Sequence, residues 1–263
     1  SLTDSQGCLN GFLYIKDEGL EENYSAINPA FAPKRRLKIG TFKVIASGFR
    51  LGERFLKIVF DNALKRNVEE IYVTLFENRD ELVALKQFFE SWGFTFHGKN
   101  TKTGETVLVK PLRFIPERSP KENFPKYNAL ASKRFLPIKP EYHSQLFPDS
   151  ILRNEVIEDY EDKKAYQYAI QKVYVSWADS KGTHPGDLVL IYRNGGSYHG
   201  VVTTLCIIKD IQRPRNLNEF IGLCQNRSIF TEKELKDFWL RTNNLCVITL
   251  LYLESLKRKV IIN

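Results

Sequence analysis

The segment Lys43–Phe55 is the part of the chain best suited to hold a phosphate group. Two glycines, Gly48 and Gly52, and two arginines, Arg50 and Arg54, stand where an apolar, strand-like run ends and a helical pattern begins. The first amides of a helix have no carbonyl partner within it, and the helix dipole adds partial positive charge, so such a junction attracts anions. A tight connection without a ligand has the same glycine spacing, and the spacing alone leaves both interpretations open.

Aromatic and cationic side chains in the last part of the sequence are of the types that contact nucleic acid. Bases stack on aromatic rings, and phosphates pair with arginine. The net charge of +8 is spread thinly along the chain, which fits a mildly basic surface as well as a polyanionic partner. A core position for Trp177 and a solvated loop for Arg213 and Arg215 are the alternatives. The candidates are Trp177, Arg193, Tyr198, Arg213, Arg215 and Arg227.

No group of residues in the sequence stands out as a catalytic centre or a metal site. The acidic candidates for a general base, Glu18, Glu21, Glu22 and Glu77, are predicted to be solvated surface carboxylates. The four cysteines are scattered, without a Cys-x-x-Cys pair or a histidine at ligand spacing, which predicts free thiols in a reducing compartment. No apolar run approaches the ~18 residues of a membrane-spanning helix. We therefore expect a soluble, cytoplasmic protein with no membrane partner.

The elements that position these residues follow an α/β order in the first 110 residues. Leu56, Val59, Phe60 and Ala63 repeat at helical spacing, and the segment Glu70–Phe76 is apolar on both faces, as in a buried strand. Gly93 is predicted to end the second helix. The predicted strands are Cys8–Lys16, Leu37–Ile45, Glu70–Phe76, Phe94–His97 and Thr106–Lys110, and the predicted helices are Arg54–Arg66 and Asp80–Trp92.

The composition changes twice after residue 110. Residues 111–150 contain seven prolines, which predicts a linker whose apolar second half docks on a domain. Residues 151–263 are rich in short strand-like runs separated by Pro-Gly and Asn-Gly turns, which predicts a small β-barrel. The expected organisation is an α/β (α+β) domain with a mixed sheet over 1–110, a linker over 111–150 and a barrel over 151–263.

Residues 8–110 resemble the GNAT (GCN5-related N-acetyltransferase) superfamily from its second strand onward. The segment Phe89–Phe94 matches the aromatic, polar and Gly-Phe ending of the family's fourth helix, and the strands and helices follow the family's order and lengths. The family's earlier strand and helices form much of its acceptor site. We expect this chain to need upstream residues or a partner to complete that fold.

The resemblance implies that the chain binds acetyl-CoA as an acyl donor. Main-chain groups of Phe42–Ile45 would pair with pantetheine, and the amides of Phe49–Arg54 would hold the pyrophosphate. The chain departs from the family at four positions. Arg50 stands where the first signature glycine belongs, and Ser47 stands where an arginine or glutamine belongs. Phe89 replaces the tyrosine that protonates the leaving thiolate, and Leu82 replaces the asparagine that commonly contacts pantetheine. The implied cofactor-binding residues are Phe42, Val44, Ile45, Phe49, Arg50, Leu51, Gly52, Glu53 and Arg54.

The C-terminal region resembles the PUA-like group, which includes the ASCH and EVE domains. The segment His184–Tyr192 has a Pro-Gly-Asp turn that leads into a barrel strand, and a later strand begins with Gly-Val at Gly200. The ASCH signature itself is absent. Domains of this group commonly bind RNA or modified bases, which implies an RNA partner for this chain.

Together the two resemblances predict an acetyl-CoA-dependent N-acyltransferase directed to RNA or an RNA-bound acceptor. Aminoacyl-tRNA is one such acceptor, as in GNAT toxins of toxin–antitoxin systems. The alternative is a non-catalytic nucleic-acid-binding or regulatory module of a larger protein, which Phe89 and the altered loop favour. No catalytic residue is identified from the sequence.

Overall fold

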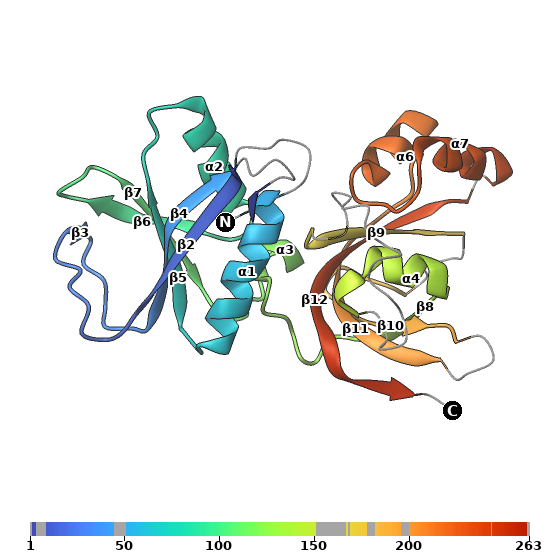
Figure 1. Cartoon of the computed structure of the whole chain (residues 1–263), viewed down its shortest axis with the longest axis horizontal. Helices are drawn as coiled ribbons and strands as arrows, with labels where there is room; N and C mark the ends of the chain where they lie inside the picture. Colours follow the sequence, from blue (N-terminus) through green and yellow to red (C-terminus); the bar gives the residue numbers. More distant parts are fainter. Residues whose placement is uncertain are drawn as a thin grey trace. The chain divides into compact units, whose positions relative to one another are not determined.

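The structure is a computed structural model of the chain, and it describes residues 2–3, 9–44, 51–150, 167, 169–177, 182–195, 200–242 and 244–261. The chain divides into two compact units. The first comprises Ser1–Ser47 and Phe55–Tyr127, and the second comprises Gly48–Arg54 and Asn128–Asn263. Each unit combines a mixed β-sheet with helices, so the predicted α/β class is confirmed at this level (Figure 1).

The first unit is built on a seven-stranded sheet with the strand order β1-β2-β4-β5-β7-β6-β3. Only β4 and β5 are parallel, and α1 connects them, whereas the other neighbouring strands are antiparallel. The strands are β1 (Leu2–Thr3), β2 (Leu9–Glu18), β3 (Ile27–Asn28), β4 (Arg36–Val44), β5 (Glu70–Leu75), β6 (Thr95–Asn100) and β7 (Thr106–Pro111). The helices are α1 (Leu51–Lys65), α2 (Asp80–Glu90) and α3 (Pro120–Asn123).

The core of this unit follows the sequence periodicity. Leu56, Val59, Phe60 and Ala63 of α1 are all buried, as their helical spacing predicts. Helix α2 ends at Glu90, two residues before the predicted end, and Ser91 is its C-cap. Gly93 follows two residues later, and its φ of +83° lies in the left-handed region that favours glycine, as predicted for the end of this helix.

Strands β4 and β5 are paired over only part of their length. Their register runs from Arg36 opposite Glu70 to Ile39 opposite Val73. From Thr41 to Val44, the described residues of β4 pair with β2 alone, and Gly40 lies at an irregularity of the β2–β4 register. Because successive residues of a strand direct their N–H and C=O groups to alternate sides, this part of β4 leaves backbone groups open on the side away from β2.

The predicted linker over 111–150 is replaced by a division at Tyr127/Asn128. Residues 111–127 fold back onto the first unit, where Phe124 is buried and contacts Phe60 and Trp92 at ring-centroid distances of 5.4 and 5.8 Å. Residues 133–150 form elements of the second unit. The prolines are compatible with regular structure here because Pro120 and Pro140 stand in the first turn of short helices, where no amide hydrogen bond is lost.

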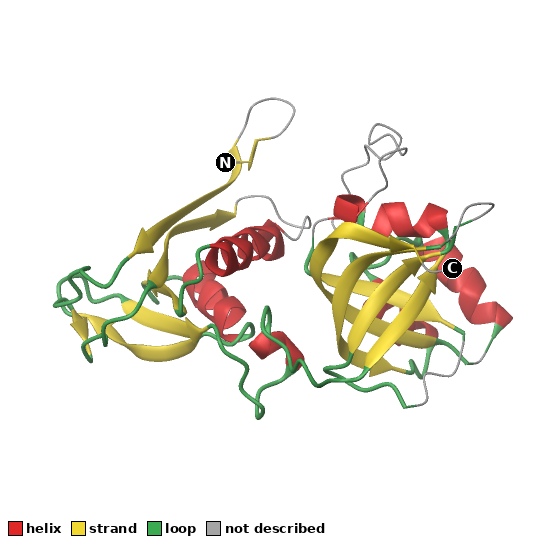
Figure 2. Ribbon diagram, turned by 90° about the horizontal axis from the view of Figure 1, so that it is seen from below, coloured by secondary structure: helices red, strands yellow, loops and turns green. Residues whose placement is uncertain are grey.

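The second unit is a half-barrel with the strand order β8-β10-β11-β12-β9 (Figure 2). Strand β8 is parallel to β10, and the remaining pairs are antiparallel. The strands are β8 (Lys133–Ile138), β9 (Gln171–Ser176), β10 (Leu188–Arg193), β11 (Val201–Gln212) and β12 (Cys246–Ile261). The helices are α4 (Pro140–Leu146), η1 (Pro148–Ser150), α6 (Leu217–Cys224) and α7 (Glu232–Arg241).

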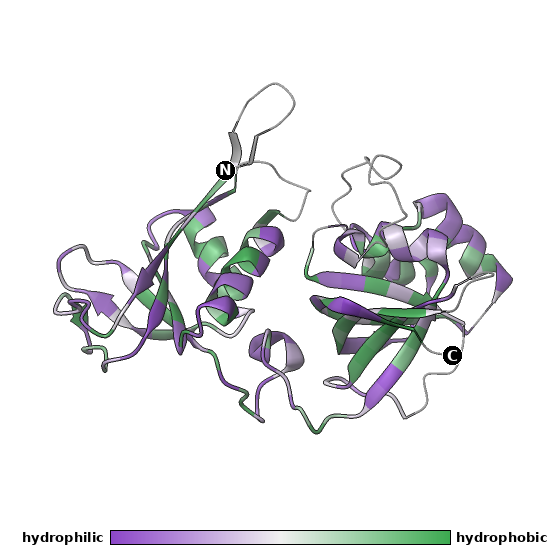
Figure 3. Ribbon diagram, turned by 60° about the horizontal axis from the view of Figure 1, so that its bottom comes forward, coloured by the Kyte–Doolittle hydropathy of each residue, from purple (hydrophilic) through white to green (hydrophobic). Residues whose placement is uncertain are grey.

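Apolar side chains pack on both faces of this sheet, whose strands show green, hydrophobic segments beside purple, hydrophilic ones in Figure 3. Successive side chains of β12 point to opposite faces of the sheet and so contribute to two hydrophobic clusters. Ile248 and Leu250 belong to the inner cluster, which includes Phe147. Val247 packs in the cluster that includes Phe220 of α6. Capping side chains at Asn216 and Thr231 begin α6 and α7. None of the helices in the described part of the chain has the length and apolarity required to span a membrane.

Candidate functional site: an aromatic pocket in the second unit

A pocket lies between the two edge strands of the half-barrel. Strand β8 contributes Pro137 and Ile138, and β9 contributes Val173–Val175. Its volume is about 270 Å³, a little below the roughly 300–1,000 Å³ of sites for drug-sized ligands, so it suits one small ring system. The other lining residues are Lys139, Tyr142, Leu146, Trp177, Asn194, Ile229 and Phe230.

The alternation of β9 places Tyr174 on the inner side of the sheet. Val173 and Val175 pack against the cluster under α6 and α7, so Tyr174 between them packs against the inner cluster. Burial raises the pKa of Tyr174, which keeps its phenol neutral in the physiological range. Tyr174 therefore adds a ring and a neutral hydroxyl to the pocket.

The other aromatic rings support one another edge to face. Trp177 contacts Phe238 at 5.1 Å between ring centroids, Phe238 contacts Phe230 at 4.8 Å, and Phe230 contacts Tyr142 at 5.3 Å. Such T-shaped contacts fix ring orientations. The side chain of Trp177 is 48% exposed, so the core position considered for it was wrong. It lies just beyond the last residue of β9, where strand alternation no longer determines burial.

Two polar side chains stand beside the aromatic rings. Asn194 and Lys139 are both exposed and both line the pocket. The loop that carries Asn194 is fixed because its backbone N–H donates to the Ile138 carbonyl at 2.8 Å. The pocket thus offers a carboxamide, which both donates and accepts, and an ammonium group, next to apolar walls. This combination can bind a flat, heteroatom-rich ring.

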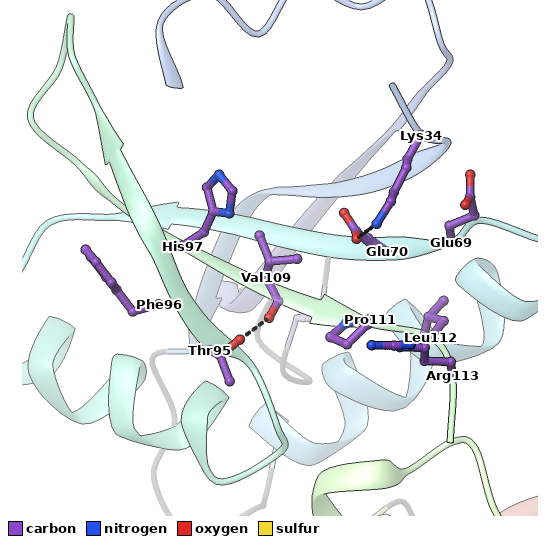
Figure 4. A pocket seen from close by; sticks show the side chains of 10 residues that line it. All are labelled: Lys34, Glu69, Glu70, Thr95, Phe96, His97, Val109, Pro111, Leu112 and Arg113. Carbon is purple, nitrogen blue, oxygen red and sulfur yellow. Dashed lines mark hydrogen bonds and ion pairs between the residues drawn. The ribbon is translucent and has the colours of Figure 1, made fainter. Parts of the chain in front are cut away.

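A second pocket, in the first unit, is less suited to a ligand because Lys34, Glu70 and His97 in its lining already have partners (Figure 4). It lies over Val109 and Pro111 and is bordered by Lys34, Glu70 and His97. Glu70 accepts hydrogen bonds from Lys34 Nζ and from Arg36 Nε, the latter at 2.9 Å. The ring of His97 is held by a 2.8 Å contact of its Nε2 with a backbone carbonyl. A ligand here would compete with ion pairs within the protein. The remaining lining residues are Glu69, Thr95, Phe96, Leu112 and Arg113.

The residues predicted to bind acetyl-CoA lie around the end of β4 and the start of α1. Phe42 packs against Phe55 and Phe89, with ring centroids 5.8 and 5.2 Å apart, and Val44 is exposed. Leu51, Gly52 and Arg54 are half-buried in the first turn of α1. Ile45, Phe49 and Arg50 lie outside the described residues.

Glu53 differs from what a pyrophosphate site requires. It is buried, and its carboxylate accepts hydrogen bonds from Gln171 N at 3.0 Å and Gln171 Nε2 at 2.8 Å within the second unit. Arg227 NH2 lies 3.9 Å from the same carboxylate. A carboxylate in the first turn already uses part of the favourable field of the helix N-terminus, and it repels a second anion.

Among the residues predicted to contact nucleic acid, the structure places only Trp177 in the pocket. Arg193 precedes the pocket residue Asn194, whereas Arg227 is engaged near Glu53. Arg213 and Arg215 are exposed beside α6, and Arg213 donates to Asn244 Oδ1 at 2.6 Å. Tyr198 lies outside the described residues.

Sequence reasoning missed the other pocket residues and one buried acid. Tyr142 and Phe230 are far apart in sequence, and only the fold brings them together. Glu18 was predicted to be a surface carboxylate, yet it is buried and accepts hydrogen bonds from Tyr24 at 3.0 Å and Tyr72 at 2.7 Å. Burial, together with the Glu18 carboxylate, raises the pKa of Tyr24 to about 12. The phenols therefore stay protonated as donors, and Glu18 has a structural role.

Comparison with known proteins adds no assignment. No protein-family model matches the chain, and no curated protein matches it significantly.

Proposed function

We propose that the chain is a nucleic-acid-binding module that holds one unstacked base in the aromatic pocket of the second unit. The observation that carries this proposal is the exposed ring of Trp177, which lines one pocket together with the rings of Tyr142, Tyr174 and Phe230 and the carboxamide of Asn194. A base has two apolar faces and a polar edge, which match the rings and the carboxamide respectively. RNA is the favoured partner because single-stranded RNA presents such bases in loops and at ends.

The half-barrel and the Pro-Gly-Asp turn that precedes β10 support a PUA-like identity for this unit. Asp187 in that turn is buried and bonds Arg134 Nε at 2.9 Å and the His184 backbone N–H at 3.0 Å. The turn is therefore a rigid support for β8 and β10. Strand β8 in turn supplies one wall of the pocket.

The test is binding of a fluorescent single-stranded oligoribonucleotide, measured by anisotropy. Trp177→Ala removes the stacking ring, and the expected loss is about 5- to 150-fold in affinity, since stacking contributes about 1–3 kcal/mol per base. Phe135→Ala is the matched control, because Phe135 is 58% exposed on β8 but does not line the pocket. Failure of the unmodified protein to bind, or equal binding by Trp177→Ala, would refute the proposal.

A second candidate function is acyl-CoA binding by the segment from β4 to the first turn of α1, and with it acetyl transfer to RNA or an RNA-bound amine such as aminoacyl-tRNA. This second function is supported by the end of the β4–β5 pairing at Ile39. Beyond that residue, the open backbone groups of β4 can pair with the amides of pantetheine. The strand order and the helix between β4 and β5 also fit a GNAT-like unit. Phe89 is fully buried and has no proton to donate, so transfer would depend on positioning rather than on this residue.

Acetyl-CoA binding is tested by thermal unfolding. A ligand at a hundredfold excess over its Kd stabilises the folded state by about 2.7 kcal/mol. Gly52→Val adds a branched side chain in the first turn of α1 and should abolish this stabilisation. If acetyl-CoA does not stabilise the unmodified protein, this second function is wrong and the nucleic-acid proposal stands.

A further inference from the structure

The C-terminal half of β12 contains a basic bulge, defined here as Leu256–Lys259. Ser255 is opposite Thr204 and Val260 is opposite Val202, so the four residues of the bulge face the single residue Thr203. Lys257 and Arg258 are exposed. A bulge of this kind turns side chains out of the regular alternation of a strand.

A buried polar chain anchors the basic bulge. His143 Nε2 lies 2.7 Å from Thr203 Oγ1, which lies 3.1 Å from Thr204 Oγ1. Thr204 Oγ1 donates to Ser150 Oγ at 2.7 Å, and Lys259 Nζ donates to the Ser150 carbonyl at 3.1 Å. Buried hydrogen bonds of this kind fix one backbone arrangement. These hydrogen bonds therefore fix the backbone that carries Lys257 and Arg258.

The strand register connects the bulge to the aromatic pocket. Ile138 of β8 lines the pocket and is opposite Arg193 of β10. Arg193 is in turn opposite Val201 of β11. Val201 is opposite Ile261 of β12, which lies three residues after Arg258. Neighbouring strands lie about 4.8 Å apart, so these three steps cover about 14 Å along the sheet. Lys139 and Arg193 stand on the pocket side of this span, and Ile261 stands at its other end, from which Arg258 is about 10 Å further along β12.

We propose that the phosphate backbone of a single-stranded nucleic acid runs from the aromatic pocket across these strand ends to Lys257 and Arg258. This inference rests on the proposed function, because a base held in the pocket must be unstacked, and its neighbouring backbone is then single-stranded. The span fits the lower end of the roughly 4–16 nucleotides bound by single-strand-binding β-barrels. Exposed lysine and arginine side chains match the charge of phosphodiesters.

The test combines oligonucleotide length with salt. Labelled oligoribonucleotides of one, two, four and eight nucleotides are titrated with the full chain at several KCl concentrations. Loss of two phosphate contacts in Lys257→Ala/Arg258→Ala should reduce the slope of log K against log salt by about 1.4, at about 0.7 per contact. Binding of the mononucleotide should not change. Affinity of the unmodified protein should rise up to about four nucleotides and then level off.

The control is Lys233→Ala/Lys236→Ala, which removes the same charge from exposed positions on α7. Its salt slope should equal that of the unmodified protein. One outcome would refute the proposed backbone path alone. In that outcome, binding of the four-nucleotide RNA depends on Trp177, but the slope of log K against log salt is the same in the unmodified protein and in both double variants. The pocket proposal would then still stand. If no oligonucleotide binds, both proposals fail.

Discussion

Lys110 is buried in the first unit beneath the turn that ends α2, and its ionisation should control the pH dependence of this unit's stability. Its side-chain Nζ donates to the Trp92 carbonyl at 2.7 Å and to the Glu122 carbonyl at 2.5 Å. Burial, reinforced by the nearby Arg118 charge, lowers the pKa of Lys110 to about 7 from 10.5. The folded chain therefore releases this proton at a lower pH than the unfolded chain does.

The sign of the effect follows from proton linkage. Between about pH 7 and 10.5 the unfolded chain binds the additional proton, so the free energy of unfolding rises with pH in that window and is lowest below pH 7. From pH 6.5 to 9 the two pKa values give an increase of roughly 2–3 kcal/mol from this residue alone. Lys110→Met retains the length of the side chain but cannot titrate.

The measurement is urea unfolding of both proteins at several pH values, followed by Trp92 fluorescence. Trp177→Phe and Trp239→Phe in the background make Trp92 the only reporter, since the chain has three tryptophans. The unfolding free energy of the chain with Lys110, relative to that of the Lys110→Met variant, should rise by roughly 2–3 kcal/mol between pH 6.5 and 9. A constant difference would show that the two carbonyl acceptors hold the charged form, and the argument from burial would be refuted.

Four further substitutions test local features by chemical denaturation. Gly104→Ala, at a φ of +78° in open space, should cost only the left-handed backbone strain of about 1–2 kcal/mol; Gly93→Ala should cost more, because its Cβ would also overlap the Glu122 carbonyl oxygen. Tyr72→Phe should lower the unfolding free energy by about 1.5–3 kcal/mol through loss of its 2.7 Å bond to a buried carboxylate. Thr231→Ala should cost about 1 kcal/mol by removing the capping box of α7, and no change would contradict the cap.

Local patterns in the sequence were sufficient for most of the first unit. The spacing of Leu56, Val59 and Phe60 predicted α1, and the apolar alternation from Glu70 predicted β5, because both patterns record which face an element buries. The glycine that ends α2 was also predicted, since only one residue type is favoured at its backbone conformation.

The prolines between residues 111 and 150 led to the main error in the organisation. Proline interrupts a helix or strand only where its backbone N–H would be needed for a hydrogen bond. Pro137 lies in the edge strand β8, where a missing N–H donor costs little stability. The residues next to a proline in the sequence do not decide whether it begins a helix or strand or separates two such elements. The aromatic pocket was unpredictable for a related reason: Tyr142, Trp177 and Phe230 meet only after the sheet has curled.

The second unit is discontinuous in sequence, and this limits how the chain can be dissected. Its residues before Asn128 include Glu53, whose carboxylate accepts both the backbone and the side-chain hydrogen bond of Gln171 at the start of β9. A fragment that begins at residue 128 would leave these two donors without that acceptor, on the same edge strand that forms a wall of the pocket. Domain boundaries chosen by chain order alone would therefore weaken the strand that binding assays are meant to probe.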